Sequence, residues 1–249
     1  MSAGNSGPFT LDGTRTYLVG ARRLAIIDPG PDAQAHLEAV AEAARGAEAA
    51  AILVTHGHPD HAPGAAGLAR ALEGAGVAVE VLGPAGVEGV ARALSDGDAV
   101  PTDEGDLLAI ETPGHARAHL SFHWPARSAL FAGDLLLGKG DTVWVGEYAG
   151  SVADYMRSLE RVRALGLRVI YPAHGPPLED PQEALDRFAA HRRERIRQVE
   201  AALAEHPQAG VDELLELVYG TALPAAAQRA ARMSMEALKA HVEEAREGA

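Results

Sequence analysis

The stretch AAAILVTHGHPDHAPG, residues 49–64, constrains the fold of this chain more than any other part. A short apolar run leads directly into three histidines and one aspartate within six positions, and Pro63 then suits the first turn of a helix. His56 and His58 are two residues apart, so in extended chain their side chains project to the same side. The polar cluster therefore sits in a loop between a strand and a helix.

Three further apolar runs end at a histidine or an aspartate beside a glycine: IETPGH ends at His115, ALFAGD at Asp134 and VIYPAH at His174. Strands that end together place such residues around one cleft. The candidate ligands are His56, His58, Asp60, His61, His115, Asp134 and His174. Seven ligands are too many for one tetrahedral ion. They suit two ions about 3.5–4 Å apart that share a bridging carboxylate.

Composition narrows the chemistry of such a site. The chain has no cysteine, which excludes disulfides, thiolate metal sites and cysteine nucleophiles, so nitrogen and oxygen must hold any metal. A formal net charge of −13 argues against a general nucleic-acid binder. No apolar run approaches the roughly 18 residues of a membrane helix, and residues 1–13 do not resemble a secretory signal. We therefore expect a cytoplasmic protein with no membrane partner.

Short β-like runs fill the first two-thirds of the chain, at 16–20, 23–30, 49–56, 77–83, 106–115, 119–124, 128–134 and 168–174. Helical patterns cover 32–46, 63–74 and 151–166, the last opening with Ser151 and Asp154 in a capping-box arrangement. From about residue 180 the strand signals stop. A long helix to about Pro207, a short helix over 211–218 and a helix from Pro224 follow. These patterns predict an α+β domain over 1–179 and a small helical appendage over 180–249.

The other histidines carry weaker signals, because a lone histidine is usually a hydrogen-bonded surface or core residue. His119 shares a segment with His115 and either supports the site or has a structural role. No ligand pattern surrounds the rest, which we interpret as surface or core residues: His36, His123, His191, His206 and His241.

The motif order H-x-H-x-D-H, T-P-G-H, G-D and a late A-H-G resembles the metallo-β-lactamase fold superfamily over residues 8–180. The resemblance implies an αββα sandwich with metals at one edge of its two sheets. LLLGKGDTVWVGEYAGSVADYMRSLERV, YPAHGPPLEDP and the helical tail are similar to the β-lactamase-like protein 2 group. That group has a C-terminal helical, winged-helix-like domain, and its characterised member is a single-strand endoribonuclease.

The resemblance also implies two metal sites that share one carboxylate. The ligands would be His56, His58 and His115 for one ion, Asp60, His61 and His174 for the other, and Asp134 as the bridge. Zinc is the default ion for this donor set, with Mn²⁺ or Fe²⁺ as alternatives. Asp60 and Asp134 would be the catalytic residues, Asp60 by orienting the attacking hydroxide or moving a proton. Arg15 and Ala116 depart from the commoner patterns, and Arg15 puts the substrate side of the cleft in doubt.

The leading expectation is a metal-dependent hydrolase that acts as a phosphodiesterase on single-stranded RNA. The long tail helix carries five arginines that could contact phosphates, namely Arg187, Arg192, Arg193, Arg195 and Arg197. A solvated face balanced by Glu183, Glu194 and Glu200 explains the same arginines equally well. The substrate is therefore expected to be single-stranded RNA or a small molecule.

Three alternatives remain open. A glyoxalase-II-like thioester hydrolase is the nearest, although the basic glutathione-binding tail of that family has no clear match here. A persulfide dioxygenase would need a single iron. A non-catalytic binding module would not need all seven ligand positions. The tail could also form a homodimer contact or simply its own core, through Leu214, Leu217, Val218 and Leu223.

Overall fold

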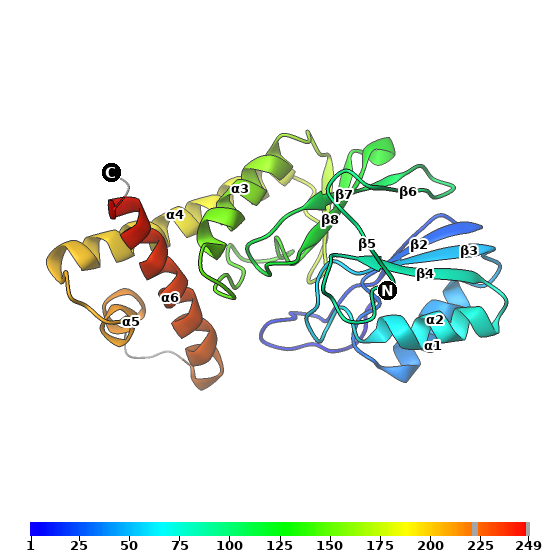
Figure 1. Ribbon diagram of the computed structural model, residues 1–249, viewed down its shortest axis with the longest axis horizontal. Helices are drawn as coiled ribbons and strands as arrows, with labels where there is room; N and C mark the ends of the chain where they lie inside the picture. Colours follow the sequence, from blue (N-terminus) through cyan, green and yellow to red (C-terminus); the bar gives the residue numbers. More distant parts are fainter. Residues whose placement is uncertain (221–223, 248–249) are drawn as a thin grey trace.

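Two mixed β-sheets form the centre of the molecule (Figure 1). The computed structural model describes residues 1–220 and 224–247. The first sheet has the strand order β1 (Tyr17–Val19), β2 (Arg23–Ile27), β3 (Ala49–Leu53), β4 (Ala78–Gly83) and β5 (Arg92–Ala93). The second has the order β10 (Val169–Pro172), β9 (Ala129–Gly133), β8 (Leu120–Trp124), β7 (Leu107–Glu111) and β6 (Ala99–Val100).

Helices cover the outer faces of both sheets. The first sheet is covered by α1 (Gln34–Ala43) and α2 (Gly64–Gly74), and the second by α3 (Ser151–Arg163) and α4 (Pro181–Glu205). A single 3-10 turn, η1 (Pro125–Arg127), joins β8 to β9. The predicted αββα sandwich is confirmed. Within the described chain, no helix has both the length and the apolar character needed to cross a membrane.

The alternation of side chains along each central strand separates the core into layers. On β2, Leu24 and Ile26 pack with α1 and α2, whereas Ala25 and Ile27 pack between the two sheets. On β9, Phe131 faces the gap between the sheets, and the residues on either side of it face α3. A one-residue slip in register would exchange the two faces. The apolar pattern therefore specifies the register.

Strand direction explains why polar strand ends gather at one place. In the first sheet β2, β3 and β4 run parallel, so their carboxyl ends lie at the same edge. In the second sheet β9 runs parallel to β10, and β7 has the same direction because β8 is antiparallel to both β7 and β9. The loops that follow β3, β7, β9 and β10 therefore open at a shared edge of the sandwich.

The C-terminal region consists of α4, α5 (Val211–Tyr219) and α6 (Ala225–Glu247); α4 and α6 contact α3 of the sandwich, and α5 packs against α4 and α6 (Figure 1). Its buried residues Phe188, Leu214 and Leu238 belong to the same hydrophobic cluster as Leu159 of α3. No strand follows β10 within residues 173–220 and 224–247. The core is thus continuous across residue 180, and the division into domains 1–179 and 180–249 stays a prediction.

The apolar residues considered for a dimer contact have different environments. Leu214 is fully buried inside the tail, Val218 is partly buried against the same cluster, and Leu217 is exposed at 48%. Leu223 lies outside the described residues. Leu214 therefore belongs to the buried core that the tail shares with α3, and the homodimer stays a prediction.

Local details differ from the sequence prediction in two places. The short strands β5 and β6 were not expected, since two residues carry too little pattern to be recognised. The predicted capping box at Ser151 is wrong: Gly150, at φ 86°, is the N-cap, and Ser151 Oγ has no hydrogen-bond partner among the described residues. The positive φ of Gly150 starts the helix one residue early. Asp154 instead accepts a hydrogen bond from Tyr148 and pairs with Arg157.

Candidate metal centre

All seven candidate ligands lie together at the shared sheet edge. Three overlapping groups each bring one donor atom per residue to within 4.8 Å of the others. The groups are His56–His58–His115, His56–His61–Asp134 and Asp60–His61–His174. Because every group shares a residue with another, the donors form one continuous cluster.

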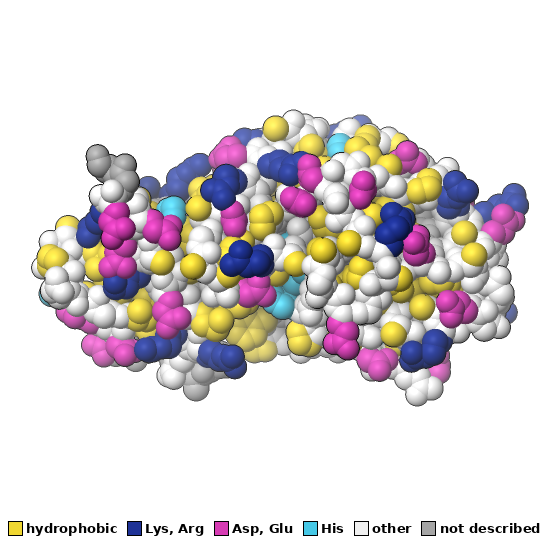
Figure 2. Space-filling view, in the orientation of Figure 1, with side chains coloured by type: hydrophobic (Ala, Val, Ile, Leu, Met, Phe, Trp, Pro, Cys, Tyr) yellow, Lys and Arg dark blue, Asp and Glu magenta, His cyan; other side chains and the backbone are white. Residues whose placement is uncertain are grey.

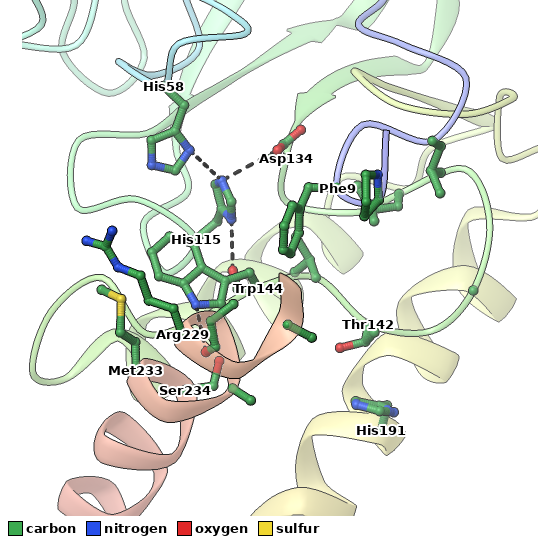
Figure 3. A pocket seen from close by; sticks show the side chains of 18 of the residues that line it. Phe9, His58, His115, Asp134, Thr142, Trp144, His191, Arg229, Met233 and Ser234 are labelled. Atoms are coloured by element: carbon green, nitrogen blue, oxygen red, sulfur yellow. Dashed lines mark hydrogen bonds and ion pairs between the residues drawn. The ribbon is translucent and has the colours of Figure 1, made fainter. Parts of the chain in front are cut away.

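The first group brings three imidazole nitrogens toward one point. His58 Nδ1 lies 3.0 Å from both His56 Nε2 and His115 Nε2. His115 Nδ1 donates to the carbonyl of Trp144 at 2.8 Å, which leaves the Nε2 lone pair free for a ligand bond (Figure 3). Burial lowers the pKa of His115, and that of His56 well below the usual value. Both rings are therefore neutral at pH 7, as metal binding requires.

The second group joins two carboxylates to two buried imidazoles. Asp60 Oδ2 lies 3.2 Å from His174 Nε2 and 3.4 Å from His61 Nε2. Asp134 Oδ1 lies 3.3 Å from His174 Nε2 and 3.5 Å from His61 Nε2, while its other oxygen lies 3.5 Å from His115 Nε2. Asp134 thus contacts both groups, in the position that a bridging carboxylate needs.

Several of these atoms are buried without a hydrogen-bond partner among the described residues. They include His61 Nε2, His174 Nε2 and Asp134 Oδ1. Buried polar atoms are normally hydrogen-bonded, so donor atoms left without a hydrogen bond in one cluster indicate a missing ligand. Divalent cations accepting these lone pairs would remove the deficit. The residues present therefore fit a two-metal centre.

Protonation of the second group also fits a site made for cations. Burial opposes the charged form of His61, but the carboxylates of Asp134 and Asp28 raise its pKa well above the usual value. Asp134 and Asp60 similarly overcome burial and raise the pKa of His174 to about 9. Despite its burial, Asp134 has a pKa well below the usual range because His61 and His174 face it. In the metal-free protein, protons on His61 and His174 therefore supply the positive charge that a metal ion would supply.

This arrangement predicts proton release on metal binding. At pH 7.5 His61 and His174 are protonated in the metal-free protein, and a metal ligand must be neutral, so about two protons should leave per chain as zinc fills the centre. Isothermal titration calorimetry in buffers of different ionisation enthalpy measures this number. The number of protons released should fall as the pH rises through about 9, the pKa of His174, because this residue then loses its proton before metal binds. Zinc binding without any proton release at pH 7.5 would contradict the arrangement.

Asp28 is a site residue that sequence reasoning missed. It follows β2 at φ 49°, is almost fully buried, and accepts hydrogen bonds from the Thr55 backbone at 2.8 Å and the Thr55 hydroxyl at 2.9 Å. Its Oδ2 also lies 2.9 Å from His61 Nδ1, which turns His61 Nε2 toward Asp134. The available signal was an aspartate directly after a buried strand, in IIDPG. A carboxylate there matches the three apolar runs that end in ligands.

His119 supports the centre from behind. Its Nε2 accepts a hydrogen bond from the Asp134 backbone at 3.2 Å, and its Nδ1 lies 2.8 Å from the Thr112 hydroxyl. Burial lowers the pKa of His119 to about 3, so the ring stays neutral. Of the two roles considered for His119, this geometry favours support of the site.

A cavity of about 840 Å³ opens beside the centre. It reaches from His58, His115 and Asp134 to α4 and α6 (Figure 3). Its apolar lining includes Phe9, Leu11, Leu137, Val143, Trp144 and Met233. In the space-filling view, histidine side chains are visible near the middle of the molecule beside a recess with hydrophobic side chains (Figure 2).

The surroundings of two other residues, His191 and Arg15, differ from those expected from the sequence. His191, interpreted as a surface or core residue, lines the cavity and lies 3.4 Å from Asp141. Arg15 is not among the lining residues; it donates to the Gly175 carbonyl at 2.6 Å and pairs with Asp12. Arg15 therefore holds the loop that carries His174 and does not line this cavity.

Comparison with known proteins agrees with this geometry. Residues 9–174 match the model of the metallo-β-lactamase superfamily. The chain belongs to this superfamily. It is accordingly a metal-dependent hydrolase with a His/Asp cluster suited to divalent ions. The matched region ends at His174, so it contains every candidate ligand.

The similarity to superfamily members extends into the tail. The chain is 33% identical over 222 residues to "Beta-lactamase-like protein 2 homolog" of Caenorhabditis elegans, covering 86% of this chain and 74% of that protein. It is 33% identical over 229 residues to "Atrochrysone carboxyl ACP thioesterase" of Aspergillus chevalieri, covering 88% and 72%. A crystal structure of a metallo-β-lactamase family protein from Thermus thermophilus superposes with a TM-score of 0.74 at 25% identity, covering 98% of this chain and 92% of that one.

Proposed function

We propose that this protein is a zinc-dependent hydrolase of acyl thioesters. The observation that carries the proposal is the apolar cavity directly beside the metal centre, lined by Val143, Trp144 and Met233. An acyl chain buries apolar surface in such a cavity, whereas a polynucleotide needs an open groove along its backbone. The similarity to an acyl-carrier-protein thioesterase over 88% of the chain supports this choice of substrate.

The residues divide the chemistry as follows. Two divalent ions held by the seven ligands would activate water and polarise the thioester carbonyl. Imidazole and carboxylate donors suit zinc for this purpose. His174 and His61 lower the pKa of Asp60 against the effect of its burial, so Asp60 stays ionised and can orient the attacking water. The walls of the cavity hold the acyl chain and exclude bulk water.

Hydrolysis of single-stranded RNA is the second candidate. It is favoured by aromatic and cationic side chains in the same cavity, since bases stack on rings and phosphates pair with cations. Phe9 is 55% exposed and lines the cavity together with Trp144 and Arg229 (Figure 3).

The arginines of α4 give the RNA candidate less support than their number suggests. Arg193 pairs with Glu160, and Arg197 with Glu194. Arg187 pairs with Glu183 and also donates to the Gly140 carbonyl. These contacts match the solvated, charge-balanced face considered from the sequence. They leave no continuous track of free cations along α4 for a phosphate backbone.

An assay of three substrates separates the candidates. The zinc-loaded protein is incubated with a medium-chain acyl thioester, a labelled single-stranded RNA and a phosphodiester probe. We expect thioester cleavage that disappears on chelation and returns with zinc. Cleavage of RNA alone would reject the thioesterase and support the second candidate. Unchanged thioester cleavage after both ions are removed would reject the two-metal mechanism.

A further inference from the structure

Four cationic side chains line the cavity, and none forms an ion pair with a carboxylate of the described chain. They are Lys139, Arg192, Arg195 and Arg229. Elsewhere most arginines do pair, as Arg22 does with Glu48. The chain carries 35 acidic and only 22 basic residues, so unpaired cations gathered at one cavity are unexpected. The carboxylates among the lining residues are the two candidate metal ligands, Asp60 and Asp134.

Arg192 is the most constrained of these cations. Its side chain is buried at 4% exposure, its Nη2 donates to the Val143 carbonyl at 2.9 Å, and its guanidinium lies 5.5 Å from the Tyr155 ring centre. Nε has no hydrogen-bond partner among the described residues. A guanidinium does not lose its proton in proteins, so Arg192 is a buried charge that lacks a counter-ion. An anion entering the cavity would supply one.

Helical spacing places a second cation on the same face of α4. Arg195 follows Arg192 by three residues, packs its guanidinium 4.7 Å from the Tyr219 ring centre and bonds Gln198 at 2.9 Å. Lys139 reaches the cavity from the loop after β9. Figure 3 shows His191, the neighbour of Arg192 on α4, on the side of the cavity away from His115 and Asp134. The cations of α4 therefore lie apart from the metal centre.

We propose that Arg192, Arg195 and Lys139 form a subsite for an anionic group of the substrate. This inference rests on the proposed function. The substrate would place its thioester carbonyl at the metal centre, its apolar portion against Trp144 and Val143, and a carboxylate or phosphate against α4. Two sources supply such an anion: a carboxylate at the end of the acyl chain, or a phosphate of the thiol carrier. Both have oxygens that pair with guanidinium groups.

A set of four thioesters distinguishes the sources. Pentanoyl and glutaryl groups differ by a terminal carboxylate, and each is offered on coenzyme A, which carries phosphates, and on N-acetylcysteamine, which carries none. The double variant Lys139→Gln, Arg195→Gln removes two cations without disturbing the buried Arg192. Arg193→Gln is the matched control, since Arg193 lies on the outer face of α4 and pairs with Glu160.

The double variant should raise KM about tenfold or more for substrates that carry the anion. KM for pentanoyl-N-acetylcysteamine should stay within about twofold, and kcat should change little for any substrate. A KM effect that follows glutaryl identifies the acyl carboxylate, and one that follows coenzyme A identifies the carrier phosphate. An equal rise in KM for all four substrates, or the same effect in Arg193→Gln, would overturn the subsite.

A binding measurement keeps the subsite testable if no thioester is cleaved. Trp144 lines the cavity and the chain has two tryptophans, so Trp124→Phe leaves Trp144 as the fluorescent reporter. Glutarate and coenzyme A are titrated into zinc-loaded protein with and without the double substitution. Weaker binding of either anion by the double variant supports the subsite. Equal affinity of the two proteins for both anions would reject it, whatever the activity.

Discussion

Replacing Asp134 by Asn should abolish most of the hydrolytic activity and reduce the bound metal to one ion or fewer. The two Asp134 oxygens face His61, His174 and His115, so one carboxylate connects both ligand groups. An amide keeps the shape but removes the negative charge and turns an N–H toward the imidazoles. Metal ions contribute several kcal/mol of transition-state stabilisation. We therefore expect activity to fall by roughly 10³-fold or more, equal to about 4 kcal/mol.

Metal content by mass spectrometry and turnover of the best thioester, measured on the same sample, check this result. Asp186→Asn is the matched control, because Asp186 lies exposed on α4 and pairs only with Arg163 among the ion pairs of the described residues. The control should keep two ions and full activity. An Asp134→Asn protein with two ions and unchanged turnover would show that Asp134 does not bridge.

The arrangement of the candidate ligands followed from the sequence because strand ends can be recognised locally. His115, Asp134 and His174 each end an apolar run, and parallel strand directions bring such ends to one edge. Period-2 alternation similarly predicts which strand residues face helices and which face the other sheet. These features depend on neighbours in the chain, so one sequence is enough to see them.

The cavity could not be predicted in the same way, because it depends on how α6 meets the loop before α3. Gly146 lies so close to Met233 that a Cβ atom would sit 2.7 Å from its backbone, and Ser234 donates to the Val145 carbonyl at 2.8 Å. Residues nearly ninety positions apart thus build one wall. No local sequence pattern predicts a contact between residues so far apart in the chain.

The arginines of α4 are an intermediate case. Five arginines suggested one surface, yet the structure divides them between the cavity and the outside. Helical spacing predicts this division. Arg192 and Arg195 are three residues apart, and Arg193 and Arg197 are four apart, so each pair lies on one face of the helix. The apolar residue Val199, fully buried seven positions after Arg192, marks the inner face. Attention to that stripe would have separated a pair that lines the cavity from a solvated pair.

A glycine directly precedes three of the candidate ligands, His58, His115 and Asp134, and the one before His115 is packed tightly against α3. Gly114 precedes His115 at φ 137°, and a Cβ atom there would lie 2.5 Å from Tyr155 Cα and 2.7 Å from Tyr155 N. Tyr155 is a fully buried residue of α3, so its backbone cannot retreat without disturbing the core. Gly114→Ala should therefore lower the free energy of unfolding by about 3 kcal/mol or more.

The same substitution should also weaken metal binding, since His115 is the next residue and meets His58 at 3.0 Å. Gly166→Ala is the matched control near the other end of the same helix: its φ is also positive, at 64°, but no atom lies within 4 Å of the added Cβ. That variant should lose only about 1–2 kcal/mol, the ordinary cost of a left-handed alanine. Urea unfolding of metal-free and zinc-loaded proteins measures both effects. Equal losses in the two variants would mean that backbone conformation, and not the close approach of α3, fixes the loop that carries His115.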